Sequence, residues 1–172
     1  MNVNAAEIEG ALSGILSGRE ERVKTRNTYL SEGVFACQIA LNIPGYPKRI
    51  QNDRQAIEKF AALFCHEWGA DPFLTENISN EAGLCWIGFF HGEPSDSQRA
   101  KKIAVGLEEG TPEGRIFDID IIVKGISLSR SEMGLPSRSC ILCGSPAKEC
   151  ARERNHPYTD LRDAVEKLIK NI

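Results

Sequence analysis

The sequence lacks any long apolar run and any leader in which basic residues precede an apolar stretch. No segment of the 172 residues approaches the roughly 20 apolar residues of a membrane-spanning helix. The first ten residues, MNVNAAEIEG, contain no basic residue that could open a secretory signal. We therefore expect a cytoplasmic protein without a membrane partner.

An excess of positive charge is also missing. The chain holds 24 acidic and 21 basic residues, a formal net charge of −3, which argues against broad electrostatic binding to nucleic acid. With 41% apolar and 26% charged residues, its composition is that of an ordinary globular protein. No repeat, low-complexity segment or linker divides it, so we expect a single domain over residues 1–172.

Apolar spacing predicts a helix over residues 5–30, with Ile8, Leu12, Ile15 and Leu16 on one face. The charged run 19–26 within it is expected to be a solvated helix face. Further helices are predicted over 54–68, up to about residue 107 from a cap at 95–97, and from a cap at Thr159 towards the end. Strands are predicted at 34–43, 72–76, 84–90, 114–123 and 126–128.

The order of these elements predicts an α+β fold. Between the N-terminal helix (1–30) and the tail, the core (34–124) follows the order β-α-β-β-α-β of the ferredoxin-like arrangement, an antiparallel sheet with two helices on one face. Residues 125–172 are expected to form an Arg- and Cys-rich loop followed by the C-terminal helix. The first and fourth strands of this arrangement are neighbours in the sheet.

Two carboxylates in a D-x-D arrangement lie on the predicted fourth strand. Because successive strand side chains point to opposite faces, Asp118 and Asp120 share one face, and Phe117, Ile119 and Ile121 share the other. Two adjacent anions repel each other and resist desolvation. Mg²⁺ is the cation usually held by one or two carboxylates together with substrate phosphates. The alternative is an edge strand whose outer face is merely solvated.

Basic residues follow this strand and the first one. Arg130 and Arg138 lie within a loop's reach of the carboxylates, and guanidinium groups can hold phosphate oxygens bidentately. Lys48 follows the turn after the first strand. It can contact the same phosphates only if this turn and the loop after the fourth strand lie at the same end of the sheet. The alternative is ordinary surface charge.

The six cysteines form two groups. Cys37, Cys65 and Cys85 lie in apolar segments, where free cysteine behaves as a small buried hydrophobe. Cys140, Cys143 and Cys150, followed by His156, have the residue types of a tetrahedral structural Zn²⁺ site. The alternative is a set of reduced thiols in a turn-rich loop.

Taken together, these segments resemble the apo-citrate lyase phosphoribosyl-dephospho-CoA transferase family. The similarity is densest from residue 107 onward, through the segments 107–109, 114–120, 128–130, 135–143 and 150–156, and is weaker at 19–22 and 44–48. The resemblance implies transfer of a prosthetic group from triphosphoribosyl-dephospho-CoA to a serine of the citrate lyase acyl carrier protein (gamma chain), with release of diphosphate. It further implies Mg²⁺ at Asp118 and Asp120, and contacts from Arg115, Arg130 and Arg138 to the donor's phosphates, with Arg115 and the two aspartates as catalytic residues.

Two other readings compete with this one. Pterin pyrophosphokinases are similar in combining a ferredoxin-like domain with a D-x-D strand and an arginine-bearing loop, and they transfer a diphosphoryl group from ATP. This chain lacks an obvious pterin-stacking segment. The third reading is a non-catalytic, zinc-stabilised interaction module, in which Asp118 and Asp120 would be inert.

Overall fold

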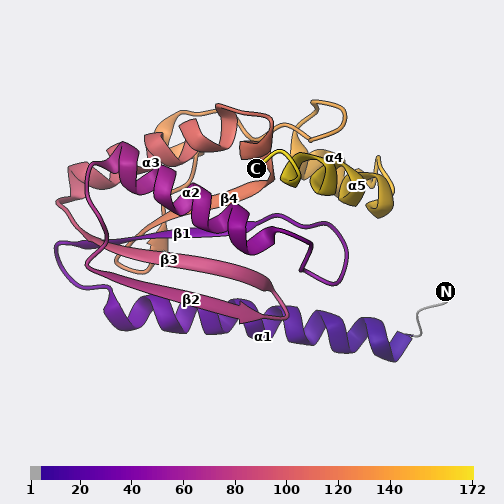
Figure 1. Cartoon of the computed structure of the whole chain (residues 1–172), viewed down its shortest axis with the longest axis horizontal. Coiled ribbons are helices and arrows are strands. Elements are labelled where there is room, and N and C mark those ends of the chain that lie inside the picture. Colours follow the sequence, from indigo (N-terminus) through magenta and orange to yellow (C-terminus); the bar gives the residue numbers. More distant parts are fainter. Residues whose placement is uncertain (1–4) are drawn as a thin grey trace.

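Five strands form one antiparallel sheet in the order β2-β3-β1-β4-β5, so the first and fourth strands are neighbours as expected (Figure 1). The computed structural model describes residues 5–172, and the side chains of residues 5–8, which include Ile8, and of Pro94 lie outside that description. The strands are β1 (Val34–Leu41), β2 (Leu74–Asn80), β3 (Gly83–His91), β4 (Phe117–Val123) and β5 (Ile126–Ser127). The helices are α1 (Ala5–Tyr29), α2 (Asp53–Trp68), α3 (Pro94–Glu109), α4 (Ala147–Glu153) and α5 (Tyr158–Ile169), with short 3-10 turns η1 (Glu113–Ile116) and η2 (Ser131–Met133).

The predicted α+β class is confirmed. In Figure 1, α2 and α3 cover one face of the sheet, α1 runs along the other face beside β2 and β3, and α4 and α5 lie together at one end. Within residues 5–172, none of these helices combines the length and apolar character needed to cross a membrane. Two helices, α2 and α3, thus cover one face of the sheet, and only α1 among the described helices covers the other.

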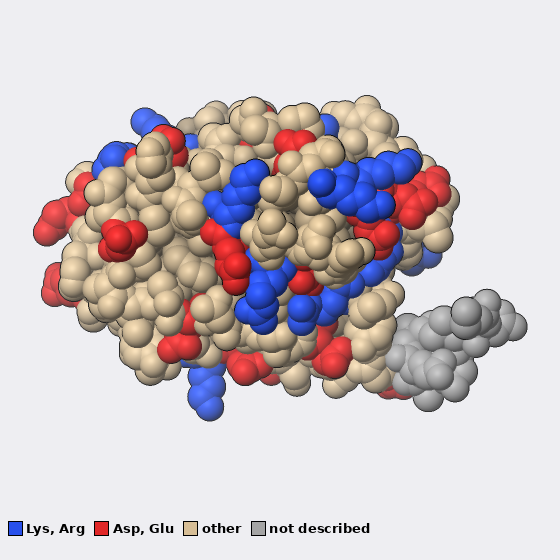
Figure 2. All heavy atoms as spheres, in the orientation of Figure 1, with Lys and Arg blue, Asp and Glu red and all other residues tan. Residues whose placement is uncertain are grey.

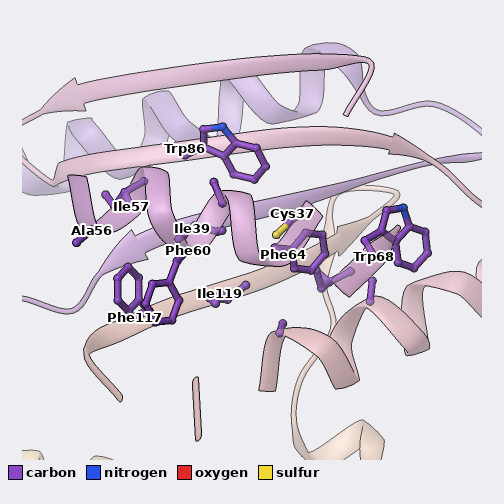
Figure 3. Packing of buried hydrophobic residues seen from close by; sticks show 14 of the residues in the cluster. Cys37, Ile39, Ala56, Ile57, Phe60, Phe64, Trp68, Trp86, Phe117 and Ile119 are labelled. Carbon is purple, nitrogen blue, oxygen red and sulfur yellow. The ribbon is translucent and has the colours of Figure 1, made fainter. Parts of the chain in front are cut away.

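The main core lies between the sheet and α2 (Figure 3). Phe60 of α2 stacks on Phe117 of β4, with ring centroids 3.7 Å apart, and Phe64 lies fully buried one turn further along. Ile119 and Ile121 follow Phe117 on the same face of β4 and are also fully buried. This packing fixes which face of β4 is turned to the core, and hence where its carboxylates point.

The N-terminal helix is confirmed, but its predicted apolar face is not the buried one. Leu12 and Leu16 are 57% and 59% exposed, whereas Gly18 and Arg22 are buried against the β2–β3 hairpin. A Cβ atom on Gly18 would lie 2.5 Å from the Asn80 side chain, so this approach requires glycine. The close approach at Gly18, rather than the row of apolar residues, marks the face of α1 that packs on the sheet.

Two predicted helix caps were wrong. Helix α3 begins after Glu93, with Pro94 at its first position, where the missing N–H costs nothing. Asp96 lies inside the first turn and accepts the Glu93 N–H at 2.8 Å, completing a capping box. Helix α5 similarly begins at Tyr158 after Pro157, and Thr159 lies in its first turn without capping it.

The strand predicted over 114–123 is shorter than expected, because Gly114 to Ile116 form η1. The carbonyl oxygen of Leu107 would lie 2.1 Å from a Cβ atom at position 114, so only glycine lets η1 pack this closely on α3. The strand predicted at 72–76 is β2, which begins at Leu74 and continues to Asn80. The segment expected to be a cysteine-rich loop also contains a short helix, α4, which carries Cys150.

Candidate active site

The two β4 carboxylates stand on the sheet face opposite the main core. Asp118 lies across from Ala40 and Asp120 across from Gln38 in the register with β1. The Asp118 side chain is 56% exposed, and Asp120 accepts a hydrogen bond from the Ser127 hydroxyl at 2.9 Å. The alternation expected from the sequence therefore places both carboxylates on one face of β4.

The electrostatics of Asp118 reflect this pairing. Partial burial raises its pKa, and the nearby charge of Asp120 raises it further, while the Arg138 guanidinium acts in the opposite direction. Arg138 approaches Asp118 at 3.1 Å, and it also pairs with Glu108. The positive charge of Arg138 is thus shared between carboxylates, which leaves the Asp118–Asp120 pair with an excess of negative charge.

Glu108 is a site residue to which sequence reasoning assigned no role. It lies at the end of α3 with only 2% of its side chain exposed, and its Oε1 accepts the Ile119 N–H at 2.7 Å. Arg138 donates to the same Oε1 atom, and Arg130 donates to Oε2 at 2.5 Å. One buried carboxylate therefore ties the segment after β5 to both α3 and β4. The sequence signal that could have identified Glu108 was its position in the segment 107–109, which resembles the transferase family.

The predicted phosphate ligands are placed differently from one another. Arg138, Arg115 and Lys48 line one cavity of about 560 Å³ between the end of β1, the 138–141 segment and α5. Arg115 also donates to the Cys140 carbonyl at 2.7 Å, and Lys48 to the Ile43 carbonyl at 2.6 Å. Arg130 is absent from the lining of this cavity, and its guanidinium pairs with both Glu108 and Glu109.

A second cavity of about 370 Å³ separates α1 from β1. Asp118 lines it, together with Lys48 and three arginines of α1, namely Arg19, Arg22 and Arg26. The expectation of a solvated helix face for 19–26 was wrong for Arg22, which is only 8% exposed. Helical spacing alone does not show which face of a charged helix turns towards a sheet.

The predicted cysteine cluster comes together in space. Cys140, Cys143, Cys150 and His156 each bring one ligand atom within 4.8 Å of the others, so these residues could hold a metal ion. The six cysteines are all free thiols. The His156 Nε2 atom is buried without a hydrogen-bond partner, and hydrogen bonds from His156 and Ser145 lower the pKa of the exposed Cys143 to about 6. Cys37 and Cys85 are buried as expected, and Cys65 is half-buried.

Comparisons with known proteins agree with the resemblance seen in the sequence. A family model described as apo-citrate lyase phosphoribosyl-dephospho-CoA transferase matches residues 11–172. Protein CitXG of Haemophilus influenzae is 37% identical over 167 residues, which cover 94% of this chain and 35% of that protein. The apo-citrate lyase phosphoribosyl-dephospho-CoA transferase of Escherichia coli O139:H28 is 41% identical over 73 residues, 42% of this chain and 40% of that protein. The chain thus spans well under half the length of these curated relatives.

A third relative, from Escherichia coli O1:K1, carries the same transferase name and is 40% identical over 73 residues. The family match extends over nearly all of the described residues, from α1 through the sheet and the carboxylate pair to α5. The chain therefore belongs to the apo-citrate lyase phosphoribosyl-dephospho-CoA transferase family.

Proposed function

We propose that this protein transfers the phosphoribosyl-dephospho-CoA group of triphosphoribosyl-dephospho-CoA to a serine of the citrate lyase acyl carrier protein. The serine oxygen forms a bond to the α-phosphorus, the bond from that phosphorus to the bridging oxygen breaks, and diphosphate leaves. The hydroxyl proton passes to a carboxylate of the pair or to water. The family match supports this reaction, whereas no observation favours the pterin pyrophosphokinase or the non-catalytic module.

The observation that carries the proposal is the Asp118–Asp120 pair on an otherwise buried strand. Both carboxylates share one sheet face. Asp118 lines the smaller cavity with four basic residues, and Arg138, which contacts Asp118, lines the larger one. Burial and, after it, the nearby charge of Asp120 raise the pKa of Asp118, and a bound cation would offset this cost of two adjacent anions. Phosphoryl transfer depends chiefly on such positioning and charge neutralisation.

The donor set fits Mg²⁺, since two carboxylates on one strand, completed by substrate phosphates, are its usual ligands. When bound, Mg²⁺ would neutralise the charge that develops on the transferred and leaving phosphates. We propose that Asp118 and Asp120 hold it and that Arg138, already in contact with Asp118, orients the donor's phosphates with Arg115 and Lys48. Arg130 is then a positioning residue through Glu108, because its guanidinium is paired with two carboxylates.

We also propose that the cysteine cluster binds structural Zn²⁺. A tetrahedral site with Zn–S bonds of about 2.3 Å places its sulfur atoms about 3.8 Å apart. The Sγ atoms of Cys140 and Cys150 are 3.5 Å apart, and those of Cys143 and Cys150 are 3.9 Å apart. Such a site would hold the Cys140 carbonyl to which Arg115 donates. Metal analysis tests it: Cys143→Ser should lose zinc, and Cys65→Ser, outside the cluster, should keep it.

We further propose that residues 1–172 act as one transferase domain. Strands β1 to β4 with α2 and α3 would form the ferredoxin-like βαββαβ unit, to which β5 adds an edge strand. Helix α1 and the Arg- and Cys-rich tail would then supply additions on the open face and at one end.

Mass spectrometry of apo-carrier protein, incubated with this protein, the triphosphoribosyl donor and Mg²⁺, tests the function. Transfer adds the mass of the group to the carrier serine. Asp118→Asn and Asp120→Asn should each lower the rate by about 100-fold or more while the thermal midpoint stays near that of the wild type. Asp163→Asn, on the exposed side of α5, is the matched control and should transfer normally. Normal rates in both β4 variants would refute the role of the carboxylate pair.

A further inference from the structure

The cavity between α1 and β1 contains an unusual concentration of positive charge, and one of its arginines, Arg22, is buried. Arg19, Arg22, Arg26 and Lys48 line it, and Asp118 is the acidic residue among the described residues of its lining. In Figure 2, Lys and Arg side chains gather in a band above the position of α1, towards the end that carries α4 and α5. A chain with a net charge of −3 has thus collected basic side chains around one hollow.

The arginines in this cavity have donors left over. Arg22 is 8% exposed and gives one terminal nitrogen to the carbonyls of Ala82 and Gly83, at 2.7 Å and 3.0 Å. Its Nε is buried without a hydrogen-bond partner, and so is the Nε of Arg26. Within the part of the chain that the structure describes, none of the three α1 arginines forms an ion pair. A buried guanidinium without a counter-ion is costly, so an anion is the expected occupant.

Helix α1 is held in place firmly enough to build a binding site. The Asn80 side chain donates to the Gly18 carbonyl at 3.0 Å and to Glu21 at 2.7 Å. Arg26 donates to Gln38 of β1 at 3.3 Å. Because residues 19, 22 and 26 are three and four positions apart, they lie on one helix face, which these contacts turn towards the sheet.

The kind of anion follows from the neighbours of the cavity. Lys48, Ile43 and Asn42 line both this cavity and the larger one of about 560 Å³, so the two spaces meet at the end of β1. Asp118, a proposed Mg²⁺ ligand, stands at the edge of the smaller cavity. The cavity therefore requires a compact anion that carries several negative charges and can lie beside a metal ion. A polyphosphate has both properties. An acidic protein helix does not fit, because Arg22 is only 8% exposed and lies against the carbonyls of Ala82 and Gly83.

We propose that Arg19, Arg22 and Arg26 of α1, with Lys48, bind the polyphosphate of the donor, including the two phosphates that leave as diphosphate. The larger cavity then takes the phosphate that is transferred, beside Arg115 and Arg138, and the organic part of the donor. This inference rests on the proposed transferase function, and it adds α1 to the substrate site. It also explains why α1 packs through glycine while leaving Leu12 and Leu16 exposed: the arginines, not the leucines, face the sheet.

Titration calorimetry with inorganic triphosphate, in the presence and absence of Mg²⁺, tests the proposal on the full chain. Arg26→Gln should weaken triphosphate binding by about tenfold, the loss expected for one charge-assisted hydrogen bond. Arg19→Gln, at an exposed position, is a second variant that leaves the fold undisturbed if Arg26→Gln should prove unstable. Lys24→Gln is the matched control, since Lys24 is an exposed cation of α1 outside this cavity and should bind triphosphate normally.

Equal binding by the wild type and the Arg26 and Arg19 variants would overturn the proposal, as would an equal loss in the Lys24 control. Steady-state transfer gives an independent result: the KM for the donor should rise in the arginine variants, and a rise only in the KM for the carrier protein would contradict the assignment. If the wild type binds triphosphate through these arginines but modifies no carrier protein, the cavity is confirmed and the proposed function is wrong.

Discussion

The buried carboxylate of Glu108 gives the sharpest test of how this site is held together. Glu108→Gln keeps the shape of the side chain, and its Oε1 can still accept the Ile119 N–H. The substitution removes the charge and replaces the oxygen that accepts from Arg130 with an amide donor. Arg130 and Arg138 would then lose their shared counter-ion. Removing one partner of a buried ion pair costs about 3–5 kcal/mol.

The lower end of that range applies here. Only 2% of Glu108 is exposed, but 13% of Arg130 and 27% of Arg138 are, so water recovers part of the loss. A loss of about 3 kcal/mol in the free energy of unfolding, at about 2–4 °C per kcal/mol for a chain of this size, lowers the thermal midpoint by about 6–12 °C.

Glu109→Gln is the matched control for differential scanning calorimetry. Glu109 is the next residue and also pairs with Arg130, but it is 54% exposed, so its charge is worth at most about 1 kcal/mol. We expect a shift of no more than about 2–4 °C for this variant. If both variants melt at the same temperature, Glu108 does not organise the segment that carries Arg138, and the electrostatic argument is refuted.

Three further predictions concern the fold and the cysteines. Phe117→Ala should lower the free energy of unfolding by about 3–5 kcal/mol in urea titrations, because it removes a fully buried ring stacked on Phe60, whereas an equal loss from the half-exposed Phe73→Ala would contradict this. Gly114→Ala should lower the thermal midpoint strongly, since its Cβ would lie 2.1 Å from the Leu107 carbonyl oxygen. Gly106→Ala, in open space on α3, should raise the thermal midpoint. A lower midpoint for Gly106→Ala than for Gly114→Ala would show that η1 can move. Iodoacetamide near neutral pH should spare Cys85, whose burial raises its pKa to about 12 and keeps it protonated. In the metal-free protein it should modify Cys143, because a pKa of about 6 leaves that thiol as the thiolate. Early labelling of Cys85, read by peptide mass mapping, would contradict its burial.

Much of the fold could be predicted because its signals are local. The apolar alternation in 117–123 and the helical spacing in 54–68 placed β4 and α2 within a few residues, and the face of Asp118 and Asp120 followed from the strand period. The helix starts were wrong at 95–97 and at Thr159, since a proline before or at the first helical position competed with a residue of good capping type. Close spacing along the chain also identified the cysteine cluster, which lies within one short segment that includes helix α4.

The sequence alone thus determined the order of the elements, the shared face of the two carboxylates and the candidate metal ligands near the C-terminus. Only the tertiary structure decided which charges meet. Glu108 binds arginines 22 and 30 residues further along the chain, and Arg22 lies against carbonyls 60 and 61 residues away. Periodicity describes a helix face but not its neighbour, and burial of a charge depends on what packs against it. For this reason the carboxylates of β4 could be found in the sequence, and the buried Arg22 of α1 could not.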